Sequence, residues 1–127
     1  MPIAGLPVLV VDPDPTNAKL VVVILRAEGA DARSASSAES ALELVPYLEP
    51  RLVITELVLP GMDGLALARQ LRATEPSILI VVVTSLNGEE RAHKAREAGA
   101  DEYVQKPLDP AAFVALVDRL VTQGGNR

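Results

Sequence analysis

The chain has 127 residues, of which 17 are acidic and 12 basic, with a formal charge of −5 and 49% apolar residues. A chain of this size can fold as one domain around its own core, and its acidic balance argues against a nucleic-acid surface. Cysteine is absent and histidine occurs once, which excludes disulfides, thiolate metal sites, cysteine nucleophiles and a multi-histidine metal centre. The chemistry therefore falls to carboxylates, hydroxyls and amines.

Short apolar runs alternate with longer helical patterns along the chain. Uninterrupted β-branched runs are typical of strands that are buried on both faces. In chain order, the expected strands are 6–11, 32–35, 52–55, 78–84 and 102–105. The expected helices are 15–28, 41–47, 64–74, 89–98 and 110–122. We expect one domain over 1–122, followed by a flexible tail or the start of a linker over 123–127.

Cap residues mark where the helices begin. Asp14 before Pro15 predicts an N-cap with proline in the first helical turn. Ser36 followed by Glu39 predicts a capping box at the second helix. The first apolar run, 3–11, ends at Asp12 and is too short to span a membrane. We therefore expect a cytoplasmic protein with neither a signal peptide nor a membrane span.

The alternation predicts the α/β class: a doubly wound parallel sheet of five strands with helices on both faces. Functional groups of such sheets gather at the carboxyl ends of the strands. Asp12, Glu56, Thr84 and Lys106 occupy those positions. Two carboxylates, a hydroxyl and an amine suit a divalent cation together with a phosphate. The alternative, that Asp12 and Thr84 only cap loops, stays open at this point.

Four sequence blocks then appear in order along the chain. They read Val-Leu-Val-Val-Asp12, Glu56-Leu-Val-Leu-Pro60-Gly-Met-Asp63-Gly64, Val-Val-Val-Thr84-Ser85 and Tyr103-Val-Gln-Lys106-Pro107. Together they resemble the receiver domain of bacterial two-component response regulators, and the resemblance covers essentially the whole chain. It implies a flavodoxin-like (βα)5 fold with strand order 2-1-3-4-5.

The resemblance also implies a phosphorylation switch rather than an enzyme. In that family an aspartate after the third strand takes a phosphoryl group from a histidine kinase, beside Mg²⁺ held by an acidic pair after the first strand. A hydroxyl and a lysine hold the phosphoryl oxygens, and Thr84 and Lys106 match them. Tyr103 matches an aromatic residue whose rotamer reports the movement of that hydroxyl.

Two departures from the family pattern affect the chemistry. Glu56 stands at the phosphoacceptor position, and Pro13 replaces the second member of the acidic pair. The extra methylene of Glu56 moves its carboxylate by roughly 1.5 Å, enough to lose in-line geometry. A cation would keep Asp12, Glu56 and the carbonyl of Val58, so we expect Mg²⁺ to bind weakly or not at all. Asp14 could replace the missing acid, but its place before a proline favours the cap.

We therefore expect an atypical receiver, either phosphorylation-independent or constitutively biased. Glu56 has three interpretations: a partial mimic of phosphorylated aspartate, a solvated acid paired with Lys106 in a site that lost its role, or an engineered substitution. The altered Pro13 argues against the last. The first alternative function is a phosphorylatable switch with unusual or engineered residues. A flavodoxin-like enzyme ranks below both, because Pro13 and Pro15 leave few amides to bind a phosphate.

Apolar residues in excess of what a core needs predict an interaction surface on the first and last helices. For the first helix we expect Leu20, Val21, Ile24 and Leu25 in the core, with Val22 and Val23 outside. For the last we expect Phe113, Val117 and Leu120 in the core, with Val114, Leu116 and Val121 outside. A homodimer would use these two helices, or the face of 89–98, 102–105 and 110–122. The expected partner is a histidine kinase, a phosphotransfer protein or an output domain, not a nucleic acid or a membrane.

Overall fold

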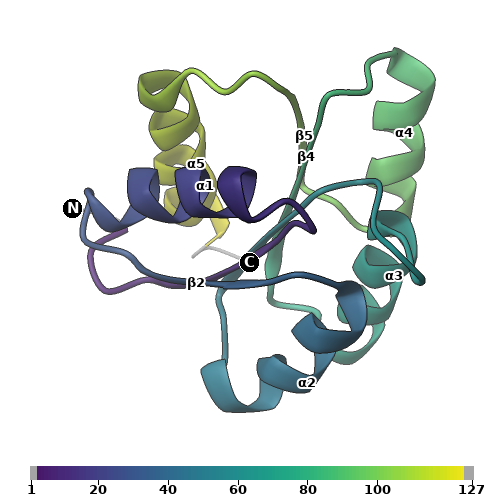
Figure 1. The fold of residues 1–127 in the computed structure, drawn as a ribbon, viewed down its shortest axis with the longest axis horizontal. Helices are drawn as coiled ribbons and strands as arrows, with labels where there is room; N and C mark the ends of the chain where they lie inside the picture. Colours follow the sequence, from purple (N-terminus) through teal and green to yellow (C-terminus); the bar gives the residue numbers. More distant parts are fainter. Residues whose placement is uncertain (1–2, 125–127) are drawn as a thin grey trace.

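The computed structural model describes residues 3–124 as a central β-sheet with helices on both faces (Figure 1). In chain order the elements are β1 (Pro7–Val11), α1 (Pro15–Arg26), β2 (Asp31–Ala35), α2 (Ala38–Leu48), β3 (Leu52–Thr55), α3 (Gly64–Thr74), β4 (Leu79–Thr84), α4 (Glu89–Ala98), β5 (Glu102–Gln105) and α5 (Pro110–Gly124). Every expected strand and helix is present. Helix α5 continues two residues beyond the expected end at Thr122, and the rest of the expected tail, 125–127, lies outside the described residues.

The sheet has the order β2-β1-β3-β4-β5 with every neighbouring pair parallel, which confirms the predicted fold class and strand order. Its register aligns Val11 with Thr55, and Thr55 with Val82. Since all strands run in one direction, their carboxyl ends meet at a single edge of the sheet. That edge is where the predicted site residues follow their strands.

The sheet separates two apolar clusters. One lies under α1 and α5, and the other under α2, α3 and α4 (Figure 1). Alternate residues of a strand point to opposite faces, so in β1 Val8 and Val10 join the first cluster while Leu9 and Val11 join the second. Burying a valine or leucine side chain fully contributes about 1.5–3 kcal/mol. The aliphatic composition is therefore explained by a sheet whose central strands pack on both faces.

The helix caps agree with the sequence at α1 and differ at α2. Asp14 caps α1, its Oδ1 accepting a hydrogen bond from the Thr16 amide at 2.9 Å, as predicted. The predicted capping box at α2 is wrong by one residue, because Ser37 is the cap and its Oγ accepts from the Ser40 amide at 3.1 Å. Glu39 takes no part in this cap, and its carboxylate accepts from the Met62 amide instead.

The faces of α1 were predicted partly wrongly. Leu20, expected in the core, is 50% exposed, whereas Val22, expected outside, is 8% exposed. The helix is apolar on nearly all sides, so its pattern does not fix its rotation, and it turns these residues to the sheet: Ala18, Val21, Val22 and Leu25. Val121 of α5, also expected outside, is buried. None of the helices within 3–124 has both the length and the apolar character needed to cross a lipid bilayer.

Candidate functional site

One ammonium group joins two carboxylates at the carboxyl edge of the sheet. Lys106 Nζ lies 3.0 Å from Asp12 Oδ2 and 2.9 Å from Glu56 Oε1. The side chains of all three residues are at most 18% exposed, which strengthens their attraction relative to a surface ion pair. Burial lowers the pKa of Lys106, but hydrogen bonds and charge from Glu56 and Asp12 outweigh it, and the pKa is raised. Lys106 is therefore a fixed cation.

Both oxygens of Glu56 are hydrogen-bonded. Oε1 accepts from Lys106, and Oε2 accepts from the backbone amides of Leu57 at 2.6 Å and Val58 at 3.1 Å. Burial raises the pKa of Glu56, but Thr84, Lys106 and the Val58 amide stabilise its ionised form and leave the pKa below its ordinary value. At neutral pH, residue 56 is thus an anion surrounded by donors.

The loop after β3 holds Glu56 in place through close backbone packing. A methyl group on Gly64 would lie 2.5 Å from the carbonyl oxygen of Glu56, so only glycine lets α3 begin this near to the end of β3. Asp63 caps α3 by accepting from the Ala66 amide at 2.8 Å. Glu39 of α2 accepts from the Met62 amide of the same loop at 3.1 Å. The sequence pattern placed Glu39 in a capping box and gave no signal for this contact.

The position after β1 offers fewer oxygen ligands for a metal ion than the family pattern implies. Asp12 Oδ1 accepts from the Asp14 amide at 2.9 Å and Oδ2 accepts from Lys106, so both of its oxygens have partners. Pro13 supplies no side-chain oxygen, and the Asp14 carboxylate caps α1. Within the part of the chain that the structure describes, no group of three His, Cys, Asp or Glu residues is arranged to hold a metal ion.

Thr84 and Tyr103 both form hydrogen bonds with the backbone of Leu86, in the loop that follows β4. Thr84 is 1% exposed, and its Oγ1 accepts from the Leu86 amide at 3.4 Å. The Tyr103 hydroxyl donates to the Leu86 carbonyl at 2.8 Å. Burial raises the pKa of Tyr103; the charge of Arg91 lowers it, the charge of Glu56 raises it, and the balance is upward. Leu86 acts through its backbone, which is why no side-chain pattern could have identified it.

Most of the predicted site residues converge at this edge: Asp12, Glu56, Thr84 and Lys106. Val58 faces Glu56 with its backbone amide, while its side chain is 59% exposed. Tyr103 stands one loop away, joined to Thr84 through Leu86. The arrangement holds an anion between a cation and N–H donors.

Comparisons with known proteins identify the relatives of this chain. The family model described as response regulator receiver domain matches residues 8–118. The DNA-binding response regulator MtrA of Mycolicibacterium smegmatis is 40% identical over 110 residues, which is 87% of this chain and 48% of that protein. A putative response regulator from Chloroflexus aurantiacus J-10-fl has a similar structure, with a TM-score of 0.86 and 31% identity over 91% of this chain and 96% of that one.

A CheY-like receiver domain protein from Methanospirillum hungatei JF-1 shares the fold, with a TM-score of 0.88, 24% identity and coverage of 94% and 95% of the two chains. The chain spans about half the length of the curated relatives it matches.

Proposed function

Since the chain belongs to the response regulator receiver domain family of two-component signalling, we propose that it is an atypical receiver, biased toward one signalling arrangement by Glu56 rather than switched by phosphoryl transfer. The placement of the Glu56 carboxylate carries this proposal, with Lys106 on one oxygen and two backbone amides on the other. A cation and N–H donors are also the groups that stabilise phosphoryl oxygens. The carboxylate thereby imitates part of a phosphorylated aspartate and shifts the population of states.

The same geometry disfavours phosphoryl transfer to residue 56. Transfer from a histidine kinase needs a carboxylate oxygen in line with the phosphorus, and such positioning supplies most of the catalysis. Glu56 reaches roughly 1.5 Å farther than aspartate because of its extra methylene, and both of its oxygens already accept hydrogen bonds. The domain then acts by binding partners and performs no enzymatic reaction.

Mg²⁺, which the family pattern implies, is proposed to bind weakly or not at all. The donors are Asp12, Glu56 and the carbonyl of Val58, and Lys106 places its ammonium between the two carboxylates. Mg²⁺ binds through one or two carboxylates with water completing its octahedron, but here both carboxylates already accept hydrogen bonds from Lys106, which the ion would have to displace. In this site Lys106 supplies the positive charge that balances the two acids.

Treatment with acetyl phosphate and Mg²⁺, followed by mass spectrometry of the intact chain, tests the proposal. We expect no mass gain for the native chain. The double variant Pro13→Asp/Glu56→Asp restores the acidic pair and the shorter acceptor while leaving Thr84 and Lys106 unchanged, and we expect it to gain one phosphoryl group. A phosphoryl group on residue 56 of the native chain contradicts the proposal.

The second candidate function is a phosphorylatable switch with an unusual acceptor. Thr84 and Lys106 favour it, because the family pattern assigns both to the phosphoryl oxygens and both stand beside residue 56. The same experiment separates the two candidates, since this one requires the mass gain in the native chain.

Partners and location follow from family membership as further proposals. We propose a cytoplasmic domain, 1–122 with a short tail or linker after it, that binds a histidine kinase, a phosphotransfer protein or an output domain. The relatives are DNA-binding regulators of about twice this length, which favours the output domain. For a homodimer, the α1 and α5 surface offers exposed Leu20 and Val23. On the alternative face of α4, β5 and α5, Glu102 already lies 3.9 Å from both Arg96 and Arg119 within the chain.

A further inference from the structure

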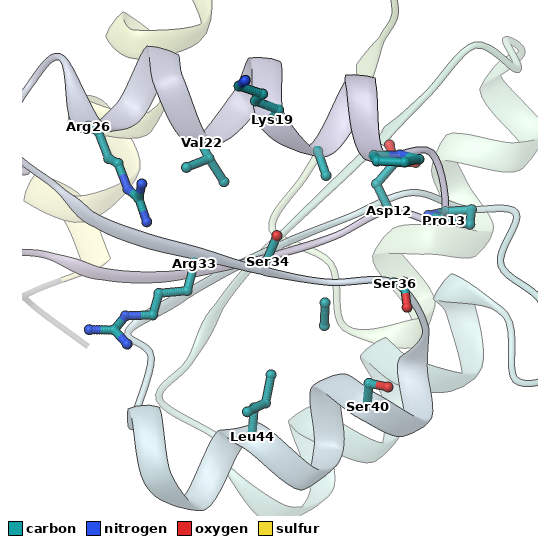
Figure 2. Close-up of a pocket in the computed structure, with 13 residues that line it drawn as sticks. Asp12, Pro13, Lys19, Val22, Arg26, Arg33, Ser34, Ser36, Ser40 and Leu44 are labelled. Carbon is teal, nitrogen blue, oxygen red and sulfur yellow. The ribbon is translucent and has the colours of Figure 1, made fainter.

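A groove of about 570 Å³ runs along the free edge of the sheet between α1 and α2 (Figure 2). Its floor is β2, which within residues 3–124 pairs with β1 on one side only. Apolar and hydroxyl side chains line it, among them Ala18, Val22, Leu44, Ser34, Ser36 and Ser40. This β2 groove therefore combines apolar side chains from α1 and α2, hydroxyl groups and the exposed edge of β2.

Three cations line the β2 groove: Lys19 and Arg26 from α1, and Arg33 from β2. The acid among its lining residues is Asp12, at the opposite end, where its carboxylate is already bonded to Lys106. The chain as a whole carries a charge of −5, so this local excess of positive charge runs against the overall balance. Charge of this sign attracts an anionic partner.

The existing contacts leave most of this cationic charge available. Arg26 uses Nε to donate to the Ala32 carbonyl at 2.9 Å, which holds its guanidinium over the strand edge. Arg33 lies 3.4 Å from Asp31, but both side chains are more than half exposed, and such a pair is worth little. Lys19 is exposed on α1.

The cations are spread along the groove rather than gathered at one point. Figure 2 shows Arg26 and Arg33 toward one end, Lys19 farther along α1, and Asp12 with Pro13 at the other end. Lys19 and Arg26 are seven residues apart on a helix, which is about 10.5 Å along its axis. In an extended peptide, carboxylates two and four residues apart lie roughly 7 and 13 Å apart, which brackets that spacing. The pattern suits an extended polyanion better than a single phosphate.

Backbone geometry favours a polypeptide as the polyanion. The Asp31 amide donates to the Leu6 carbonyl, and the Ala35 carbonyl accepts from the Asp12 amide. The backbone groups of Asp31 and Ala35 in β2 therefore face β1. Residues of a parallel strand face its neighbour alternately, which turns the backbone of Ala32 and Ser34 toward the groove. Arg26 covers the Ala32 carbonyl, while the Ser34 backbone is presented to a chain lying alongside.

We propose that the β2 groove docks an extended, acidic segment of a partner protein. Acidic side chains of the segment pair with Lys19 and Arg26 on the α1 side, and the alternate, apolar side chains rest on Leu44 on the α2 side. Arg33 adds positive charge beside them. Its far end abuts Asp12 and Pro13, so the occupant lies next to the site described above.

Fluorescence anisotropy with a fluorescein-labelled octapeptide of alternating Glu and Val tests this docking on the full chain. We expect saturable binding that Lys19→Glu weakens about three- to tenfold, as expected for reversing one exposed charge. Lys94→Glu is the matched control: it makes the same charge change on α4, at the other side of the molecule, and we expect the affinity to stay unchanged. Lys19 is exposed, so the variant keeps the fold, which circular dichroism verifies.

Amide chemical shifts locate the bound peptide. We expect the largest shifts on β2, with Ser34 and Ala32 foremost. The proposal is overturned by absence of saturable binding, by equal weakening in Lys94→Glu, or by largest shifts on α4 or α5. Tighter binding of an oligothymidylate of equal length overturns the choice of a polypeptide as the occupant.

Discussion

On the side of the site that follows β4 and β5, Thr84 and Lys106 supply the hydroxyl and the amine that the family pattern assigns to phosphoryl oxygens. On the side that follows β1 and β3, Pro13 and Glu56 replace two acids of that pattern. The residues that would bind the phosphoryl oxygens, and so sense the negative charge, are thus present. Two of the residues that would take up the phosphoryl group, and so load the site, differ from the pattern. Sensing needs only an anion at the right place, whereas loading also needs a metal ion and in-line geometry. Under the proposed function, this chain keeps the first requirement without the second.

Removing Lys106 should have the largest effect, because it connects the two sides. Lys106→Met leaves the carboxylates of Asp12 and Glu56 with little solvent and no cation, and we expect a loss of about 3 kcal/mol in the free energy of unfolding. Urea denaturation at neutral pH measures it. Lys94→Met removes an exposed lysine paired with Glu90 and should cost less than about 0.5 kcal/mol. Equal losses in the two variants would contradict a special role for Lys106.

Acid titration should sharpen the comparison on the β3 side. The lowered pKa of Glu56 means that its contribution is fully present above the ordinary value of 4.5 and is lost as pH falls through the folded-state pKa. Glu56→Gln should therefore cost about 1–2 kcal/mol at neutral pH, and the difference from the native chain should shrink in acid.

Urea denaturation at several pH values checks this expectation. Glu43→Gln, an exposed position on α2, is the control. A difference between Glu56→Gln and the native chain that stays constant down to strongly acid pH would count against the ionised, donor-held carboxylate.

On the β1 side, variants of Asp14 test whether its carboxylate serves as a helix cap or as a metal ligand. Asp14→Ala should lower stability by about 1 kcal/mol, and Asp14→Ser, which preserves an N-cap acceptor, should recover most of it. Thermal denaturation compares the two variants, and calorimetric titration with Mg²⁺ should find the same weak response in both. A loss in Asp14→Ser as large as in Asp14→Ala would show that capping is not what Asp14 provides.

The smallest expected effect is the influence of Glu56, on the β3 side, on the pKa of Tyr103, on the β5 side. Because the charge of Glu56 contributes to the raised pKa of Tyr103, Glu56→Gln should lower that pKa. A Tyr47→Phe background removes the other tyrosine, which is 85% exposed, so that tyrosinate absorbance reports Tyr103 alone. An unchanged titration would argue that Glu56 is not coupled to the Tyr103 position.

The fold was predictable from the sequence because strand and helix signals agree with one another. The uninterrupted runs at β1, β3 and β4 are buried on both faces, and the alternation fixes a parallel sheet. The rotation of α1 was not predictable, since a helix that is apolar all round offers several equivalent stripes. Only packing against β1 and β2 distinguishes Val22 from Leu20.

The site was predictable as a set of positions but not as a set of contacts. Strand ends bring Asp12, Glu56 and Lys106 to one edge in any sheet of this order. The partners of the Glu56 carboxylate are instead backbone amides of the following loop, and the conformation of that loop depends on Gly64 and on Glu39 from α2. Such contacts arise from tertiary structure and leave no pattern in neighbouring residues.

The bridge from Lys106 to Asp12 joins residues that are 94 positions apart, and so it ties the first strand to the end of the last one. Closing so long a loop costs conformational entropy that local contacts cannot repay early in folding. During synthesis, Asp12 and Glu56 lack their cation until Lys106 has been added near the end of the domain. The ion cluster can therefore form only once Lys106 is present, and a partner that recognises it would discriminate against chains that end before β5.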